Sequence, residues 1–314
     1  MAIVLKQEDR EYIEVTASAT LDKFKEVVSS AKKELNTRRI PGAEVLANPN
    51  PMTGSAAIQN VDRISRETME DYTRLVREPA IARVVVQDEN EQERTYFICR
   101  ACPPTGDLNM ASYRTPLGRL ASLPVGEEIT LPGGRIFIVQ EVAKLHPLEV
   151  DEEWDSRDSI LETESLGPIT VASLRASLSM AVGRTVLEKT EAEEKEAAII
   201  FEGVRRSVIT KMGLRDQPIL DRYQDEIFRL PLDRQMLILG PPGTGKTTTL
   251  IRRLGQKLDM EYLLEEERYL VEKVGPANGT KHTESWLMFT PTILLQQYLK
   301  ESFAREGSPA SDRR

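Results

Sequence analysis

The sequence predicts a chain that joins an α+β part to an α/β part. Short strand-like runs separated by turn residues fill residues 81–146, which favours a small, largely antiparallel sheet. Helical and strand-like runs alternate over residues 216–314, which is typical of a parallel sheet covered by helices. Apolar residues at helical spacing predict a helical region over residues 1–80, and residues 147–215 are expected to form an acidic linker and a helical connector.

The composition is that of a globular protein and argues against several other classes. Of the 314 residues, 40% are hydrophobic and 29% are charged. No apolar run approaches the roughly 20 residues that a membrane-spanning helix needs, and the first residues lack the pattern of a signal peptide. Two cysteines give no disulfide framework. We therefore expect a cytoplasmic protein with no membrane partner.

Most of the net charge of -8 lies in one segment. Between Glu149 and Glu164, eight acidic residues and one arginine give a net charge of -7, so the rest of the chain is nearly neutral. We interpret this segment as a solvated linker. An alternative is that its charge imitates a nucleic acid and closes over a basic cleft.

Two helices are expected in the N-terminal region. The first is predicted by five apolar residues at helical spacing, namely Leu21, Phe24, Val27, Val28 and Ala31. A loop rich in proline and glycine follows over residues 41–54, and the second helix is expected over residues 63–77, ending near Pro79. We expect about 15 residues, or roughly 22 Å, for each helix.

Four strands are expected in the second region. They cover residues 81–86, 94–102, 126–131 and 135–142. Pro132-Gly133-Gly134 is predicted to form the turn between the last two. In the connector, residues 191–209 carry glutamates early and basic residues late, which suits the dipole of a helix.

The strongest chemical signal is Gly-Pro-Pro-Gly-Thr-Gly-Lys-Thr at residues 240–247, which matches the phosphate-binding pattern G-x-x-x-x-G-K-[ST]. An apolar strand is expected at residues 235–239, directly before this loop. An amphipathic helix is expected directly after it, with Arg252, Arg253 and Lys257 facing solvent. This strand, loop and helix are the context in which the pattern binds a nucleotide.

The residue types in the loop have a physical explanation. Glycines let backbone N–H groups turn toward an anion, and the helix that follows points its positive dipole end at the phosphates. Lys246 would reach the β- and γ-phosphates of ATP, and the Thr247 hydroxyl would hold Mg²⁺. The residues expected around the nucleotide are Gly240, Pro241, Pro242, Gly243, Thr244, Gly245, Lys246, Thr247 and Thr248.

Two further segments lie at informative distances from the loop. Gln224 lies 22 residues before Lys246, and a strand-like run from Trp286 ends in Thr290-Pro291-Thr292. With the loop, this arrangement resembles superfamily 1 helicases of the UvrD type. The resemblance implies a partial RecA-like domain in which Gln224 recognises adenine through its amide. It also implies that Thr290 and Thr292 contact single-stranded DNA.

The sequence departs from that family in its acidic residues. Such helicases need an acidic pair at the end of a strand and a second RecA-like domain. The nearest match, Leu263-Leu264-Glu265-Glu266, begins its acidic pair only 19 residues past Lys246 and lies in a charged helical pattern. We therefore expect the chain to resemble the front part of a helicase and to drive little or no unwinding alone. The alternatives are a P-loop ATPase of another class, such as AAA+, and a non-enzymatic regulator with a vestigial loop.

Several segments of the second region form another pattern. In order they are Ser112-Tyr113-Arg114-Thr115-Pro116-Leu117-Gly118-Arg119, Val125-Gly126-Glu127, Pro132-Gly133-Gly134 and Ile136–Val142. Together they resemble the C-terminal domain of the Gre transcript-cleavage factors. The resemblance implies an FKBP-like fold that docks on RNA polymerase, with Ser112, Pro116 and Arg119 at matching positions. An unrelated small β domain is the alternative.

The N-terminal region departs from the Gre factors. Those proteins carry a long helical hairpin whose acidic tip holds Mg²⁺ in the polymerase active site. Here the expected helices are short, and the loop between them contains Glu44 but no acidic pair. We therefore expect docking on RNA polymerase without stimulated RNA cleavage.

Cys99 and Cys102 form a C-x-x-C pattern. A structural zinc site needs four ligands, and the only histidines, His146 and His282, lie far away in the sequence. We interpret the two cysteines as ordinary residues of a strand end, with a redox or metal pair as the alternative.

Overall fold

The computed structural model of the chain has two compact units, Met1–Ile219 and Leu220–Arg314. The described residues are 7–37, 68–178 apart from 105 and 108, 204–205, 219–259, 262–274, 286–293, 295–297, 299 and 303. The fold mixes helices with a sheet that contains both antiparallel and parallel strand pairs. The expected α+β class is therefore confirmed at this level.

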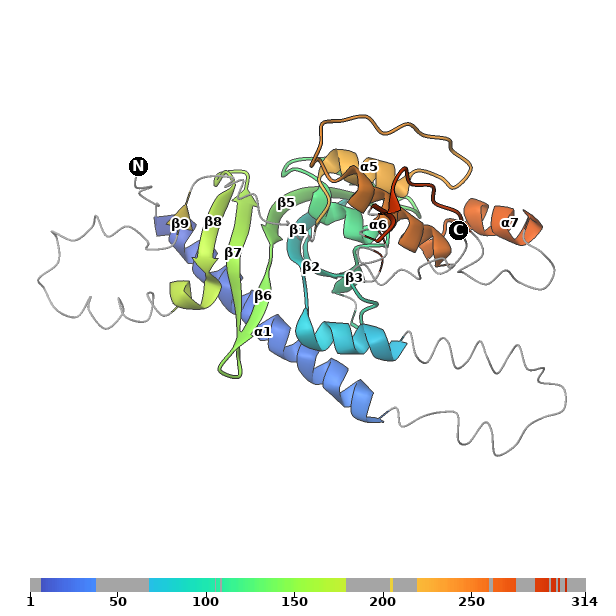
Figure 1. Cartoon of the computed structure of the whole chain (residues 1–314). Coiled ribbons are helices and arrows are strands. Elements are labelled where there is room, and N and C mark those ends of the chain that lie inside the picture. The colour runs from blue at the N-terminus through green and yellow to red at the C-terminus, as the bar shows by residue number, and fades with distance from the viewer. Residues whose placement is uncertain are drawn as a thin grey trace, which may run out of the picture. The chain divides into compact units, whose positions relative to one another are not determined.

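One mixed sheet organises the described part of the first unit (Figure 1). Its strands are β1 (Ala82–Asp88), β2 (Glu93–Cys99), β3 (Met110–Ser112), β4 (Glu128–Thr130), β5 (Ile136–Lys144), β6 (Pro147–Val150), β7 (Glu153–Thr163), β8 (Ile169–Ser173) and β9 (Val204–Arg205). Their order is β3-β2-β1-β5-β7-β8-β9, with β4 paired to β5 and β6 paired to β7. The pair β2–β3 is parallel, and every other pair among the described strands is antiparallel.

The four strands expected in the second region are confirmed as β1, β2, β4 and β5, with ends shifted by a few residues. The turn between β4 and β5 is also confirmed, since Gly133 and Gly134 have φ of 88° and 78° there. Leu131 N–H donates to the Arg135 carbonyl oxygen at 2.8 Å and closes this turn. Positive φ explains the two glycines, because other residues adopt it at a steric cost.

The acidic segment forms strands, so the expectation of a linker there is wrong. Its residues make the second half of β6 and all of β7. Strand β7 pairs with both β5 and β8, which extends the sheet beyond residue 146. Trp154 and Leu161 of β7 are buried in the core. Asp155 is buried too, and its carboxylate accepts hydrogen bonds from the Ser156 N–H at 2.7 Å and the Ser173 hydroxyl at 2.8 Å. The acidic residues of β7, among them the exposed Glu153 and Asp158, obscure the strand pattern in the sequence.

The helix expected over residues 191–209 lies largely outside the described residues. Within it, Val204 and Arg205 are described, and they form β9, paired with β8. At these two residues the helical prediction is wrong, because their backbone groups pair with the edge of the sheet instead.

The N-terminal helix α1 (Gln7–Thr37) has 31 residues, about twice the expected length. At 1.5 Å per residue it spans about 46 Å. The five apolar residues that predicted it are all buried, as expected. The prediction of its length was wrong because Thr16 and Thr20 interrupt the apolar pattern between Ile13, Ala17 and Leu21, which extends the buried face toward the N-terminus.

Helix α1 packs against the sheet through aromatic and aliphatic contacts. Figure 1 draws it running across β7 and β8. The rings of Phe24 and Trp154 meet edge to face, with 5.9 Å between their centroids. The helix over residues 68–77 adds Tyr72 and Leu75 to the same core. The loop expected at residues 41–54 lies outside the described residues.

The second unit contains α5 (Arg222–Arg229), α6 (Lys246–Leu258) and α7 (Glu265–Val274). Residues 235–239 and 286–290 form neither helix nor strand, and neither segment pairs with a strand of a sheet. The expected parallel sheet is therefore not formed within the described part of this unit. Accordingly, Leu237 and Leu239 remain 82% and 80% exposed.

The described helices do not meet the requirements of a membrane span. Within the described residues, no helix combines the length and the apolar character that crossing a bilayer requires. The longest of these helices, α1, has a mixed surface, since Lys23, Lys25 and Glu26 lie between its buried residues.

Phe24→Ala is expected to destabilise the first unit by about 3–5 kcal/mol, because it removes a fully buried ring and leaves a cavity beside Trp154. Urea unfolding followed by Trp154 fluorescence, in a Trp286→Phe background, measures this change. The control Val15→Ala, at a position on the same helix that is 64% exposed, should stay within about 0.5 kcal/mol. Equal midpoints for the two variants would contradict the packing described here.

Candidate functional site

The glycine-rich loop ends in a tight turn directly before α6. Gly243 and Gly245 have φ of 79° and 76°, a conformation that glycine adopts readily. Gly245 is the N-cap residue of α6, and its carbonyl oxygen accepts the N–H of Thr249 at 2.9 Å. The N–H groups of the first turn of a helix have no acceptor within the helix, so this turn is suited to bind an anion.

Lys246 bridges the two sides of the loop. Its ammonium group donates to the carbonyl oxygens of Gly240 at 2.8 Å and Pro241 at 2.6 Å. Its contact with the Thr244 hydroxyl is longer, 3.5 Å. Thr244 in turn donates its hydroxyl to the Pro241 carbonyl oxygen at 2.9 Å. A positive charge is thus held at the N-terminal end of α6, where the helix dipole also favours a bound anion.

The threonines after Lys246 differ in their surroundings. Thr247 and Thr248 are exposed on the first turn of α6. Thr249 is buried, and its hydroxyl donates to the Gly245 carbonyl oxygen at 3.0 Å. The hydroxyl of Thr247 is therefore accessible to a hydrated Mg²⁺ ion, the role expected for it from the sequence.

Gln224, which precedes Lys246 by 22 residues in the sequence, lies against this loop. Its side-chain Nε2 donates to the Thr244 carbonyl oxygen at 3.0 Å. Gln224 also belongs to the capping box of α5, in which Asp221 Oδ1 accepts the Gln224 N–H at 2.9 Å. The structure thus brings together Gln224 and the phosphate-binding pattern, although they are separated in the sequence.

Arg253 joins α6 to the C-terminal end of α5. Its guanidinium donates to the carbonyl oxygens at that end, which belong to Ile227, Phe228, Leu230 and Pro231. These carbonyls carry the negative end of the α5 dipole, which a cation stabilises. Burial lowers the pKa of Arg253 from its usual value, and nearby Glu267 opposes the shift. The prediction that Arg253 faces solvent is wrong, and so is the same prediction for Arg252, because both residues are buried.

Lys257 is also buried, contrary to the prediction, and it is paired with Glu267 of α7. The ammonium and carboxylate make a close ion pair whose side chains are 5% and 2% exposed. Burial lowers the pKa of Lys257, while the hydrogen bond to Glu267 raises it. Glu267 also accepts the N–H groups of Leu232 at 2.8 Å and Leu264 at 3.1 Å. Sequence patterns gave no signal for this network.

Glu265 and Glu266 are the acidic pair that best matches the one helicases need. Both lie in the first turn of α7 and are exposed. No strand leads into this pair among the described residues of the second unit. Acidic residues at a helix N-terminus favour the helix through its dipole, so this position explains the pair without catalysis.

Thr290 is the last residue of the segment 286–290, and Thr292 lies two residues beyond it. The Thr290 hydroxyl donates to the Thr292 carbonyl oxygen at 3.2 Å, and the Thr292 hydroxyl accepts the Leu295 N–H at 3.2 Å. The Thr292 contact is that of an N-cap for the helical turn that follows. Both hydroxyls therefore have local roles.

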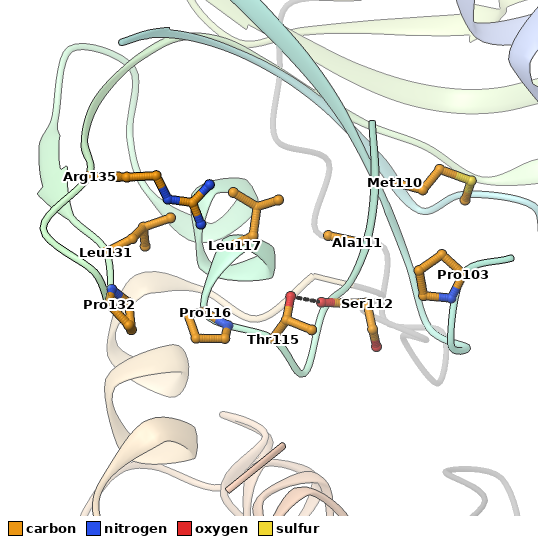
Figure 2. A pocket seen from close by; sticks show the side chains of 10 residues that line it. All are labelled: Pro103, Met110, Ala111, Ser112, Thr115, Pro116, Leu117, Leu131, Pro132 and Arg135. Atoms are coloured by element: carbon orange, nitrogen blue, oxygen red, sulfur yellow. Dashed lines mark hydrogen bonds between the residues drawn. The ribbon is translucent and has the colours of Figure 1, made fainter. Parts of the chain in front are cut away.

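The first unit contains a surface pocket of about 300 Å³ (Figure 2). Its walls are mostly apolar and are formed by Pro103, Met110, Ala111, Ser112, Thr115, Pro116, Leu117, Leu131, Pro132 and Arg135. In Figure 2 the guanidinium of Arg135 points toward Leu117 across one side of the pocket. An apolar wall with one cation at its edge is suited to an apolar side chain that lies next to an acidic group.

The segment predicted to dock on polymerase forms one wall of this pocket. Pro116 precedes the 3₁₀ helix η1 (Leu117–Ser122), which carries Arg119, as the sequence predicts. Pro116 and Ser112 both line the pocket. Pro116 is exposed, whereas Ser112 is fully buried. The Ser112 carbonyl oxygen accepts the Thr115 hydroxyl at 2.7 Å. A Cβ on Gly118 would come within 2.5 Å of that same oxygen, so this close packing requires glycine.

The two cysteines differ in burial. Cys99 is fully buried and donates its S–H to the Ala101 carbonyl oxygen at 3.1 Å. Burial raises the pKa of the Cys99 thiol well above its usual range, and nearby Cys102 adds to the shift. Because the thiolate is the reactive form, this environment is unfavourable for redox chemistry at neutral pH.

Glu267→Ala is expected to destabilise the second unit by about 3–5 kcal/mol, because it leaves the buried Lys257 ammonium without its counter-ion. Urea unfolding followed by Trp286 fluorescence, in a Trp154→Phe background, measures the change. Glu266→Ala, one residue away and exposed, is the matched control and should stay within about 0.5 kcal/mol. If both variants unfold at the same urea concentration, the ion pair does not support the unit.

No protein-family model matches the sequence, and no curated protein matches it. The resemblances to the helicases and to the Gre factors therefore rest on the motifs and spacings given above. The function has to be inferred from the residues that these motifs bring together, above all Gln224, Lys246 and Thr247.

Proposed function

We propose that the unit from Leu220 to Arg314 binds ATP together with Mg²⁺ at the loop of residues 240–247. The observation that carries this proposal is the convergence of Lys246, the N-terminus of α6 and Gln224 on one loop. An ammonium group and free helical N–H groups supply charge and hydrogen bonds for phosphate oxygens. These are the groups that phosphoryl binding requires, whichever class of P-loop protein contains them.

Each group has a distinct task in the proposed complex. Lys246 would turn a donor toward the β- and γ-phosphates, and the exposed Thr247 hydroxyl would be a ligand of the Mg²⁺ that these phosphates hold. Bound Mg²⁺ would neutralise part of the charge of the triphosphate. The half-buried Gln224 would offer its amide to the edge of adenine, since an amide both donates and accepts hydrogen bonds.

We further propose that this unit has the nucleotide-binding part of a helicase motor and touches single-stranded DNA through Thr290 and Thr292. The exposed position of Thr292 leaves its hydroxyl within reach of a ligand. We expect little or no unwinding by this chain alone, because Glu265 and Glu266 occupy a helix start rather than a strand end. A P-loop ATPase of another class remains the alternative, as does a regulator with a vestigial loop.

Lys246→Ala is expected to weaken the binding of ATP at saturating Mg²⁺ by at least about tenfold, the equivalent of 1.4 kcal/mol. The reason is the loss of the only ammonium group that contacts the described loop. Isothermal titration calorimetry measures the affinity. Lys273→Ala, which removes an exposed lysine of α7, is the control and should bind like the wild type. Wild-type protein that takes up no ATP would refute the proposed function.

As a second function, we propose that the first unit docks on RNA polymerase through the pocket beside η1. The observation that favours it is the position of Pro116 and Leu117 in the wall of an apolar pocket, with Arg135 at its edge. Exposed apolar concavities of this kind are typical of protein-binding sites. Arg119 lies on η1 two residues beyond Leu117 and would add a charged contact at the side.

Arg135→Glu is expected to lower the affinity for purified RNA polymerase at least about tenfold, because it reverses the one charge in the wall of the pocket. Surface plasmon resonance with immobilised polymerase measures the binding. Leu117→Asp tests the apolar wall, and Leu148→Asp, at a residue of β6 that is 40% exposed, is its control. Unchanged binding of both pocket variants would show that polymerase does not use this pocket.

A further inference from the structure

The side chain of Gln224 uses both ends of its amide within the protein. Its Oε1 accepts the Asp221 N–H at 3.4 Å, and its Nε2 donates to the Thr244 carbonyl oxygen at 3.0 Å. These neighbours fix the orientation of the amide, because a backbone N–H can only donate and a carbonyl oxygen can only accept. One donor and one lone pair of the amide are left for a ligand.

The contact with Thr244 determines how the next peptide group lies. A trans peptide is planar, so its C=O and N–H point in opposite directions. Because Gln224 holds the Thr244 carbonyl oxygen toward α5, the N–H of Gly245 is turned to the other side of the same peptide plane. Without that restraint the glycine, with its wide choice of φ, would allow this peptide to turn over.

The orientation of this peptide matters for an anion. An N–H group that faces a phosphate attracts it, whereas a carbonyl oxygen in the same place repels it. Gly245 also has no Cβ, and a Cβ there would come within 2.7 Å of Gln224 Nε2. The loop and the glutamine therefore fit closely only with glycine at this position.

Helix α5 holds Gln224 in place from both ends. At its N-terminus the Asp221 carboxylate caps the helix, and at its C-terminus Arg253 of α6 binds the last carbonyl oxygens. The glutamine is thus attached to a helix that is itself tied to the helix following the loop.

We propose that Gln224 is a positioning residue for phosphate binding: it orients the Thr244–Gly245 peptide so that the Gly245 N–H faces the phosphates. This inference rests on the proposed function of the loop and goes beyond the recognition of adenine. A glutamine that only reads the base affects the binding of nucleotides. A glutamine that orients the loop also affects the binding of phosphate chains that carry no base.

The test compares ATP with inorganic tripolyphosphate, both at saturating Mg²⁺, by isothermal titration calorimetry. Gln224→Met keeps the length of the side chain and removes its donor and acceptor. It is expected to weaken the binding of tripolyphosphate by about fivefold or more, the size of effect that the loss of one hydrogen bond gives. Loss of affinity for ATP alone, with tripolyphosphate bound as in the wild type, would overturn the inference.

Two further variants separate the orientation of the loop from the stability of α5. Gln224→Glu keeps the capping contact with the Asp221 N–H but cannot donate to Thr244, so it should weaken tripolyphosphate binding as well. The loss relative to the wild type should persist at about 0.5 M NaCl, where repulsion by the new charge is screened. It provides the test if the methionine variant does not fold. Asp221→Ala removes the cap, but Arg253 still ties α5 to α6 and the Gln224–Thr244 contact is kept, so its affinity should stay within about twofold of the wild type. An equal loss in Asp221→Ala and Gln224→Met would assign the effect to the helix and overturn the proposal.

Wild-type protein separates failure of this inference from failure of the proposed function. If the wild type binds neither ATP nor tripolyphosphate, the proposed function is wrong and the inference falls with it. If the wild type binds both, and Gln224→Met and Gln224→Glu retain tripolyphosphate, only the inference is wrong.

Discussion

The junction at Gly245 is the constraint on which the rest of the second unit depends. Its φ of 76° favours glycine, and a Cβ there would come within 2.7 Å of Gln224 Nε2 and displace that side chain. The residue closes the loop on one side and begins α6 on the other. Because α5 also reaches the loop here, a change at this one residue alters the loop, both helices and the contact with Gln224 together.

Buried charges fix the directions of the helices in this unit. Arg253 and Lys257, one turn apart on α6, bind the end of α5 and Glu267 of α7, respectively. Desolvation makes such contacts costly, so they contribute less to stability than their geometry suggests. Their directional hydrogen bonds nevertheless favour one arrangement of α5, α6 and α7. The apolar cluster around Ile251 instead joins α6 to residues between Trp286 and Phe303.

The sequence predicted what depends on spacing along the chain and missed what depends on distant partners. The loop, the start of α6 and the position of Gln224 were predicted because fixed spacings carry them. The burial of Arg253 was missed, since its partners are backbone carbonyls that leave no pattern in the residue types. The strand β7 was missed because its acidic residues outnumber the apolar ones. In α1, Thr16 and Thr20 alternate with Ile13 and Ala17 on the N-terminal part of the buried face, which weakened its apolar pattern in the sequence.

A phosphate-binding loop commonly lies between a strand and a helix, and here the helical side supplies the restraint. The segment before the loop, residues 235–239, has no ladder partner within the described part of the chain. Helix α5, about 12 Å long at eight residues, is tied to the loop by Gln224 and to α6 by Arg253, two turns beyond Lys246. Since both its position and its direction are thereby set, α5 can hold the Thr244–Gly245 peptide without a sheet. Under the proposed function, a base bound by the remaining donor and lone pair of Gln224 would leave the contact with Thr244 in place, so one amide group would serve both base and phosphate.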